Sequence, residues 1–325
     1  MTSGAFRAAL DEAKTRGTGL ILIAAHCRPD GDAVSSVSAA AGILKDAGYH
    51  TRILLPDPVP DSCIPFIPEE LVLKGTDQIQ PALFLVLDCS NPERIAAGNF
   101  QPECPVINID HHPDNRLPAD LSLVRSECCA TAEVLFHLFS GCGFHISKEN
   151  ATRLLLGILT DSGCFRFDNT TPEALETAAE LIRLGADRHF IVTEAFLNRD
   201  PALVRLEADL LNNGLHTAFG GRLAWFVLTK EILAKYGVDV KNTENLIDAV
   251  RNIRGVEFAA LLREENGGFK LSLRTKNAPW SAGKVARRLN GGGHEMAAGG
   301  FIFAENAETA GTILAEQVQM EFETL

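Results

Sequence analysis

The sequence has little of what marks a secreted or membrane-bound protein. Its longest apolar runs, GLILIAA at 19–25 and ALFLVL at 82–87, are too short to span a bilayer. The N-terminal residues form a charged helical pattern, with no apolar segment before a cleavage site. The eight cysteines are scattered and none forms a C-x-x-C pair. This spacing suits neither a disulfide framework nor a zinc knuckle. We therefore expect reduced thiols, a cytoplasmic location and no membrane contact.

Basic residues are also in the minority. The chain has 30 Lys and Arg against 42 Asp and Glu, a formal net charge of −12 at pH 7. A protein that binds long duplex nucleic acid needs a broad basic surface, so such a partner is not expected. A small anionic substrate remains compatible with the composition, because a few local cations are enough to hold it.

With 325 residues the chain is long enough for two domains. In residues 1–190, strand-like runs alternate with helical patterns, which predicts an α/β domain with a mostly parallel sheet and helices on both faces. Residues 191–214 predict a helical connector, and residues 215–325 a smaller α/β domain with a mixed sheet and a hairpin turn at Gly267-Gly268. The expected strands are 20–25, 51–55, 83–87, 106–109, 223–228, 258–263, 269–274 and 301–303. The expected helices of the first domain are 34–47, 130–138, 148–159 and 172–184.

Acidic residues and histidines follow three of the expected strands. They are His26, Asp30 and Asp32 after the first strand, Asp88 after the third, and Asp110, His111 and His112 after the fourth. Because the carboxyl ends of parallel strands meet at one edge of a sheet, these side chains are expected to gather there. Crowded carboxylates repel one another unless cations neutralise them. Mixed oxygen and imidazole donors suit Mn²⁺ or Mg²⁺, and then Fe²⁺ or Co²⁺, better than structural Zn²⁺.

Each of these residues alone has an ordinary explanation. An aspartate that ends a strand commonly caps a helix, and a lone histidine is usually a surface or core residue. Their shared position at the ends of three strands favours a metal site over a set of coincidences. Gly31, between two of the aspartates, is expected to let the loop turn tightly so that both carboxylates face inward.

Four segments resemble the ordered motifs of the DHH phosphoesterases. They are HCRPDGDA (26–33), LVLDCSNPER (85–94), IDHHPDN (109–115) and GILTDSGCFRFDNTTPEA (157–174). Two later segments, KLSLRTK (270–276) and NGGGHEMAAGG (290–300), resemble the DHH-associated domain. The combination is similar to stand-alone bacterial oligoribonucleases that also remove the 3′-phosphate of adenosine 3′,5′-bisphosphate.

The resemblance implies two divalent metal ions, Mn²⁺ first, with Mg²⁺ or Co²⁺ as alternatives. The implied ligands are His26, Asp30, Asp32, Asp88, His111 and Asp161. His26 and Asp30 would hold one ion and Asp32 the other, with Asp88 bridging both. The remaining two ligands would complete the second site or be shared. An activated hydroxide would then attack phosphorus in line.

The resemblance also implies residues that act on the substrate. His112 would face the phosphate as a charge stabiliser or proton donor, and Asp110 would orient a histidine. The expected substrate-binding residues are Arg166, Arg274, Gly291, Gly292, Gly293 and His294. The three glycines would offer unblocked backbone N–H groups to an anion. A cysteine nucleophile is disfavoured, because carboxylates around Cys27 or Cys89 would raise the pKa of the thiol.

Two positions depart from the pattern of the family. Ser35 occupies a position that is usually glycine, so the start of the following helix and its phosphate contacts are in question. Asn290 replaces a fourth glycine in the C-terminal run, a change that asparagine tolerates because it adopts left-handed φ angles.

The leading hypothesis is therefore hydrolysis of short RNA oligonucleotides, with 3′-phosphatase activity on the bisphosphate. Phosphodiesterases for linear or cyclic dinucleotides, including cyclic di-AMP, are the first alternative, and pyrophosphatases or exopolyphosphatases are another. A nucleotide-binding sensor without catalysis is the alternative from a different class, although all the ligand residues are intact. The resemblance also hints at a homodimer.

Overall fold

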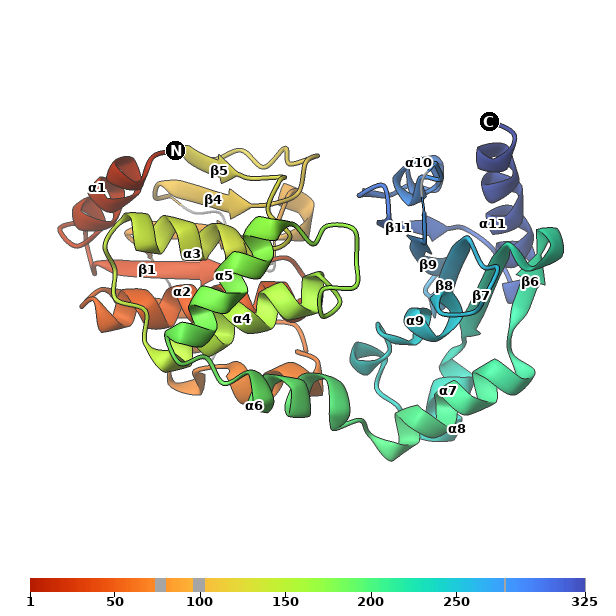
Figure 1. The fold of residues 1–325 in the computed structure, drawn as a ribbon. Coiled ribbons are helices and arrows are strands. Elements are labelled where there is room, and N and C mark those ends of the chain that lie inside the picture. Colours follow the sequence, from red (N-terminus) through yellow and green to blue (C-terminus); the bar gives the residue numbers. More distant parts are fainter. Residues whose placement is uncertain (74–79, 96–102, 278, 325) are drawn as a thin grey trace. The chain divides into compact units, whose positions relative to one another are not determined.

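The computed structural model describes residues 1–73, 80–95, 103–277 and 279–324. It divides into two compact units, Met1–Asn198 and Arg199–Leu325 (Figure 1). The division falls inside residues 191–214, where the sequence predicts a helical connector. Among the described residues, no helix is both long and apolar enough to cross a membrane.

A parallel five-stranded sheet forms the centre of the N-terminal unit, as predicted. Its strands run in the order β2-β1-β3-β4-β5, and every neighbouring pair is parallel. The strands are β1 (Leu20–Ala24), β2 (His50–Leu54), β3 (Leu83–Leu87), β4 (Val106–Asp110) and β5 (Leu121–Val124). The sequence does not predict β5, which is a four-residue edge strand without a buried apolar run.

The helices of this unit pack mainly against one face of the sheet. They are α1 (Ser3–Ala13), α2 (Gly31–Asp46), α3 (Thr131–Gly141), α4 (Lys148–Asp161) and α5 (Pro172–Arg183), followed by the short α6 (Arg188–Val192) and a π-helical turn, η4 (Thr193–Leu197). The first five share one apolar core with Ile21 and Ile23 of β1. Outside the strands, the described residues that pack on the opposite face, with Leu22 and Phe84, come from loops rather than from helices. The sequence predicts helices on both faces of the sheet. In the part of the chain that the structure describes, the helices pack against one face.

A mixed six-stranded sheet forms the centre of the C-terminal unit, again as predicted. Its strand order is β10-β11-β9-β8-β7-β6, with β7 and β8 parallel and the other pairs antiparallel. The strands are β6 (His216–Ala218), β7 (Leu223–Leu228), β8 (Phe258–Glu265), β9 (Gly268–Thr275), β10 (Gly292–Gly293) and β11 (Ala297–Ile302). The helices are α7 (Pro201–Asn213), α8 (Lys230–Tyr236), α9 (Leu246–Arg251), α10 (Ala282–Arg288) and α11 (Ala307–Phe322).

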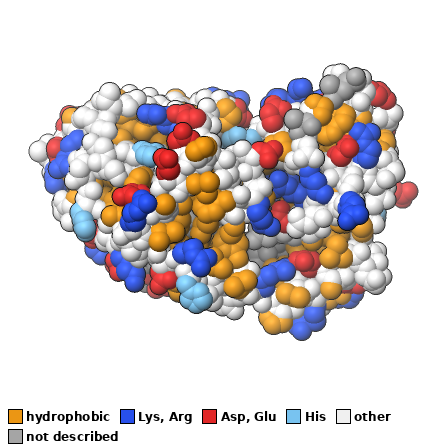
Figure 2. Space-filling view, in the orientation of Figure 1, with side chains coloured by type: hydrophobic (Ala, Val, Ile, Leu, Met, Phe, Trp, Pro, Cys, Tyr) orange, Lys and Arg blue, Asp and Glu red, His pale blue; other side chains and the backbone are white. Residues whose placement is uncertain are grey.

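Charged side chains of both signs cover the two units. On the face drawn in Figure 2, Lys and Arg side chains are interspersed with Asp and Glu over each of them.

One prediction for the C-terminal unit needs correction. The sequence predicts a strand at 301–303, but β11 begins earlier, at Ala297, because the small residues of the glycine-rich segment themselves pair with β9 and β10.

Candidate metal centre

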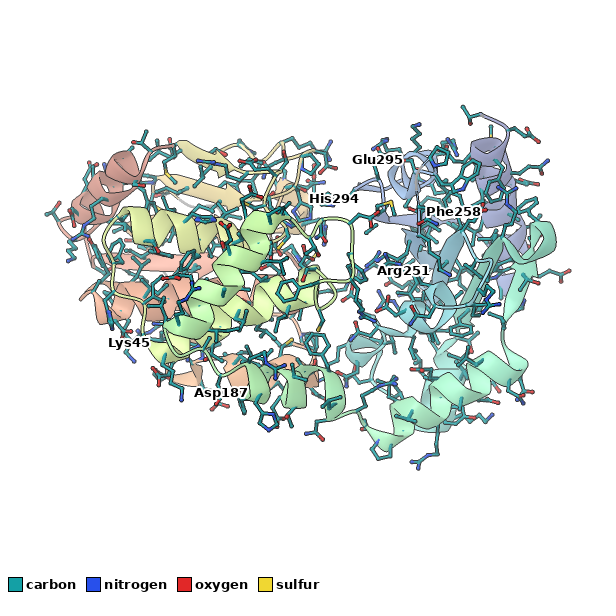
Figure 3. The ribbon with its side chains drawn as sticks, in the orientation of Figure 1. Lys45, Asp187, Arg251, Phe258, His294 and Glu295 are labelled. Carbon is teal, nitrogen blue, oxygen red and sulfur yellow. The ribbon has the colours of Figure 1, made fainter. Side chains whose placement is uncertain are left out.

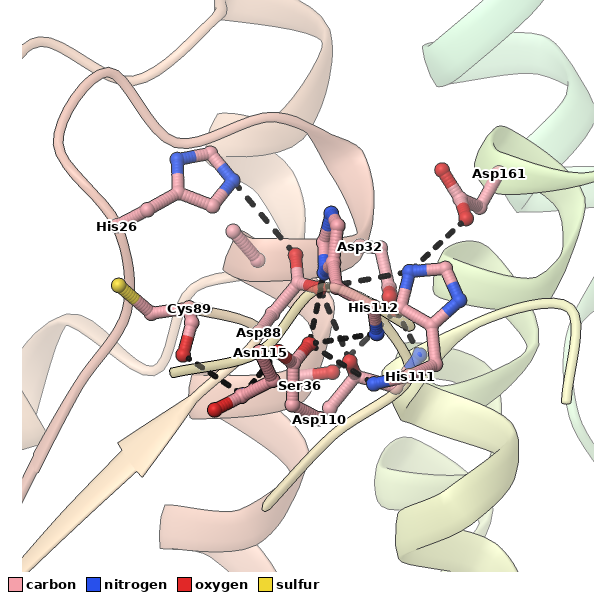
Figure 4. Close-up of polar contacts among 12 residues, drawn as sticks. His26, Asp32, Ser36, Asp88, Cys89, Asp110, His111, His112, Asn115 and Asp161 are labelled. Atoms are coloured by element: carbon pink, nitrogen blue, oxygen red, sulfur yellow. Dashed lines mark hydrogen bonds and ion pairs between the residues drawn. The ribbon is translucent and has the colours of Figure 1, made fainter. Parts of the chain in front are cut away.

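The carboxyl ends of β1, β3 and β4 bring the predicted side chains to one edge of the parallel sheet. These strands are neighbours in the order β1-β3-β4, so the segments that follow them leave the sheet side by side. His26, Asp88 and His111 follow the three strands, and Asp161 ends α4 (Figure 4). Three groups of donors have ligand atoms within 4.8 Å of one another: His26, Asp30 and Asp88; Asp88, His111 and His112; and Asp32, His111 and Asp161.

Asp88 lies at the centre of the cluster. Its Oδ2 is 3.6 Å from Nε2 of His26, and its Oδ1 is 3.7 Å from Nε2 of His111. Nε2 of His26 is also 3.6 Å from Oδ2 of Asp30, and Nε2 of His111 is 3.4 Å from Oδ2 of Asp161. These separations exceed the usual hydrogen-bond length. They suit donors that surround a cation, and Asp88 is shared between two of the groups.

The charge balance of the cluster also fits divalent cations. Although burial alone lowers the pKa of His26, the neighbouring carboxylates of Asp30 and Asp88 raise it well above its usual range. Burial and the repulsion of Asp88 raise the pKa of Asp32 well above its usual range, and partial burial raises the pKa of Asp161 to about 6. The metal-free site therefore resists carrying its full negative charge, because Asp32 and Asp161 take up a proton more readily than usual. Cations bound to oxygen and imidazole donors would remove that conflict.

His112 is held by a network behind the cluster. Its Nδ1 lies 2.7 Å from Oδ1 of Asp110, a buried carboxylate that also accepts from the backbone N–H of His111 at 2.8 Å. Nδ2 of Asn115 donates to Oδ2 of Asp110 at 2.5 Å and to Oδ1 of Asn108 at 2.8 Å. The expected contact between Asp110 and a histidine is thus made to His112. Sequence reasoning assigns no role to Asn115, although it lies in the quoted IDHHPDN segment.

The electrostatic surroundings favour a charged His112. Burial alone lowers its pKa, but the hydrogen bond to Asp110 and the negative charge of Asp88 raise the pKa of His112 to about 9. Because Asp110 engages Nδ1, this nitrogen is poorly placed to bind a cation as well. His112 also belongs to one of the three donor groups, together with Asp88 and His111.

Gly31 is required for a different reason from the one expected. It is the first residue of α2, and its backbone does not adopt the left-handed conformation. A side chain there would place Cβ 2.5 Å from Cγ2 of Thr160 near the end of α4. The glycine thus permits a close approach of two helices rather than a tight turn. Asp30 provides the N-cap of α2, accepting from the N–H of Ala33 at 3.0 Å.

Ser35 joins the same two helices. It lies inside α2, where its Oγ donates to the carbonyl of Arg153 and accepts from the N–H of Gly157 at 3.0 Å. A side chain at Gly157 would overlap Oδ1 of Asp32 and lie 2.6 Å from Cβ of Ala132. The serine on α2 is therefore accommodated by a glycine on α4.

We expect Gly157→Ala to loosen both the core and the site. The added methyl has no room, and overpacking of this kind costs about 1–3 kcal/mol of stability. Because the methyl also displaces Asp32, the affinity for Mn²⁺ should fall, as measured by titration beside chemical denaturation. Gly4→Ala in α1 is the matched control, since the nearest atom to the new Cβ is 4.0 Å away. Unchanged stability and affinity in Gly157→Ala would contradict the packing described.

The cysteine beside the cluster is not poised as a nucleophile. Burial is the main cause that raises the pKa of the Cys89 thiol to about 11, and its Sγ donates to the carbonyl of Asn91 at 3.2 Å. The sequence attributes this effect to neighbouring carboxylates, whereas desolvation dominates. None of the eight cysteines forms a disulfide.

The C-terminal unit holds most of the predicted substrate-binding residues. Arg274 is half-buried on β9, and its guanidinium donates to the carbonyl of Leu273 at 3.1 Å. Gly292 and Gly293 form β10, and His294 follows directly and appears beside Glu295 in Figure 3. The N–H of Gly291 donates to the carbonyl of Ala286 at 3.0 Å, so this amide is not unblocked for an anion.

Close contacts and backbone conformation explain why residues 290–300 are rich in glycine. A side chain at Gly291 would overlap the carbonyl of Gly299 on β11, and Gly293 has a φ of 132°. Asn290 has a φ of 55°, which confirms that the asparagine occupies a left-handed conformation.

In the N-terminal unit, Arg166 is exposed after α4, and its Nε donates to the carbonyl of Gly163 at 2.6 Å.

Comparisons with known proteins agree with this geometry. Residues 20–158 match the model of the DHH family, N-terminal domain, and residues 225–320 match the DHHA1 domain. The chain is 33% identical over 93% of its length to the bifunctional oligoribonuclease and PAP phosphatase NrnA of Thermus thermophilus, covering 90% of that protein. It is 26% identical to the protein of the same name from Bacillus subtilis, covering 94% of each chain. A crystal structure of an exopolyphosphatase-related protein from Bacteroides fragilis has the same fold, with a TM-score of 0.83 at 23% identity, covering 97% of this chain and 96% of that one.

Proposed function

Since this chain belongs to the DHH family of phosphoesterases, we propose that it hydrolyses short oligoribonucleotides to mononucleotides and removes the 3′-phosphate of adenosine 3′,5′-bisphosphate. The observation that carries the proposal is the buried Asp88, shared by two groups of donors at the edge of the sheet. Relatives named for both activities match the chain over nearly its whole length, which supports this choice of substrates.

The ligands proposed for two divalent cations are His26, Asp30, Asp32, Asp88, His111 and Asp161. Their carboxylate oxygens and imidazole nitrogens suit Mn²⁺ first, with Mg²⁺ or Co²⁺ as alternatives. Bound cations would lower the pKa of a water that attacks phosphorus and would neutralise the phosphoryl oxygens. Asp88 would be the shared ligand, since it lies within reach of His26 on one side and His111 on the other.

His112 is proposed to act on the phosphate itself. Asp110 holds its Nδ1 and favours the charged ring, whose Nε2–H would donate to a phosphoryl or leaving oxygen. An imidazolium at this place stabilises negative charge as it develops on the phosphate. It would also supply a proton to the departing oxygen, which leaves as a hydroxyl group.

The C-terminal unit is proposed to bind the nucleotide. On β9, Leu271 and Leu273 enter the core, whereas Lys270, Ser272 and Arg274 are half-exposed on the opposite face. Alanines lie opposite Arg274 on both neighbouring strands, Ala259 on β8 and Ala297 on β11. Such small neighbours suit an arginine that pairs with a phosphate through two N–H groups.

A panel of substrates tests the proposed function. The protein is loaded with Mn²⁺ and offered dinucleotide RNA, adenosine 3′,5′-bisphosphate, cyclic di-AMP and pyrophosphate in parallel. We expect turnover of the first two. Preferential cleavage of cyclic di-AMP would indicate a dinucleotide phosphodiesterase instead, and binding of nucleotides without any turnover would indicate a sensor.

Loss of Arg274 should weaken substrate binding more than catalysis. We expect Arg274→Ala to raise the KM for dinucleotide RNA by about 10-fold or more, because a charge-assisted hydrogen bond contributes about 1.5–3 kcal/mol. The kcat should change much less. Arg254→Ala is the control, since Arg254 is an exposed arginine of the same unit. An unchanged KM in Arg274→Ala would remove this residue from the proposed binding surface.

The proposed location is the cytoplasm. None of the eight cysteines forms a disulfide, which supports a reducing compartment. The homodimer stays a prediction, and sedimentation velocity of the purified protein tests it.

A further inference from the structure

The N-terminus of α3 is not capped by its own N-cap residue. Its N-cap residue is Ala130, which has no side-chain acceptor for the free N–H groups of the first turn. Asp32 of α2 provides the acceptors instead. Its Oδ2 accepts from the N–H of Thr131 at 2.6 Å, and its Oδ1 accepts from the N–H of Ala132 at 3.1 Å. A carboxylate proposed as a metal ligand therefore also caps a neighbouring helix.

Thr131 contacts a second carboxylate of the cluster through its side chain. Its Oγ1 donates to Oδ1 of Asp88 at 2.9 Å, and the residue is fully buried. One residue thus holds Asp32 with its backbone N–H and Asp88 with its hydroxyl. The β-branched side chain has few rotamers available, so the two contacts are fixed relative to each other.

We infer that Thr131 is a positioning residue that sets the separation of Asp32 from Asp88 and thereby the affinity for one of the two cations. This inference rests on the proposed function, which makes both aspartates ligands. Hydrogen bonds from outside the ligand set orient metal ligands, and their loss typically weakens metal binding about 10–100-fold. The hydroxyl of Thr131 engages Oδ1 of Asp88, whereas Oδ2 lies toward His26.

The residues around Thr131 make further contacts that hold residues 128–133 in place. Nδ1 of His111 lies 3.3 Å from the carbonyl of Cys128, a contact that directs Nε2 of the ring toward Asp88 and Asp161. Oε2 of the buried Glu133 accepts from the N–H of Cys129 at 2.7 Å. A single short segment before and within the first turn of α3 therefore contacts three of the proposed ligands.

The experiment measures cation binding rather than turnover. Metal-free wild type, Thr131→Val and Thr131→Ser are titrated with Mn²⁺ by calorimetry, with circular dichroism to check folding. Thr131→Val keeps the shape and the backbone N–H but removes the hydroxyl, so we expect one of two ions to bind about 10–100-fold more weakly. Thr131→Ser restores the hydroxyl and should restore the affinity.

Thr51→Val is the matched control. Thr51 is also buried, and its Oγ1 donates to the carbonyl of Ala41 at 3.1 Å, so this variant loses a buried hydroxyl bond outside the cluster. Its affinity for Mn²⁺ should equal that of the wild type. If Thr131→Val does not fold, Thr131→Ala is titrated in the same way.

Two outcomes would overturn the inference, and they can be told apart. Two ions bound to the folded Thr131 variant with wild-type affinity would show that the hydroxyl does not set the separation of the carboxylates. Failure of the wild type to bind Mn²⁺ would overturn the proposed function itself, and the inference with it.

Discussion

Asp88→Asn should abolish the binding of both cations and reduce kcat/KM by about 10⁴-fold or more, because the chemistry depends on the bound metal. The variant keeps the shape of the side chain and removes the charge that two groups of donors share. Asparagine is a better choice than alanine here, since Asp88 has a φ of 51° and asparagine tolerates this conformation. Calorimetric titration with Mn²⁺ and hydrolysis of dinucleotide RNA measure the two losses.

The control replaces an aspartate of the same unit outside the cluster. Asp187, which Figure 3 labels, caps α6 by accepting from the N–H of Phe190 at 3.0 Å, and asparagine is an equally good cap. Asp187→Asn should bind Mn²⁺ and turn over substrate as the wild type does. Residual activity in Asp88→Asn above one hundredth of the wild type would show that Asp88 is not the shared ligand.

The sequence predicts which side chains gather at the metal centre, because the ends of the strands determine where those side chains lie. Once β1, β3 and β4 are recognised as parallel neighbours, the residues that follow them must share an edge. Asp161 is different, since it ends a helix and no strand-end rule places it. Its position in the prediction rests on the resemblance to the family rather than on the pattern of the chain.

The sequence does not predict the contacts that orient these residues. Ala130 at the start of α3 offers no capping side chain, and the cap comes from Asp32, almost a hundred residues earlier in the chain. Likewise, Gly31 and Gly157 are glycines because α2 and α4 approach closely, which depends on the packing of whole helices. Local patterns describe residues that are near in sequence, whereas these constraints arise only between segments that folding brings together.

His112→Gln should slow the chemical step while leaving the cations in place. We expect kcat to fall by about 10²–10⁴-fold, the usual effect of removing a general acid or base. The affinity for Mn²⁺ should change little, because Asp110 engages Nδ1 of His112 and the proposed ligands are untouched. Single-turnover hydrolysis and Mn²⁺ titration separate the two quantities. Loss of an ion in His112→Gln would make His112 a ligand and contradict its assignment to the phosphate.

The pH dependence of the metal-free protein offers a second test of this residue. The pKa of His112 is raised to about 9 in the folded protein, against about 6.5 in an unfolded chain. A raised pKa means that the folded state binds the proton more tightly, so this stabilisation is complete below about pH 6.5 and is lost as pH rises through about 9. The difference in unfolding free energy between metal-free wild type and His112→Gln should therefore shrink over that interval. Thermal unfolding at several pH values measures this difference in free energy. If the difference stays constant from pH 6.5 to 9, Asp110 does not hold His112 as an imidazolium.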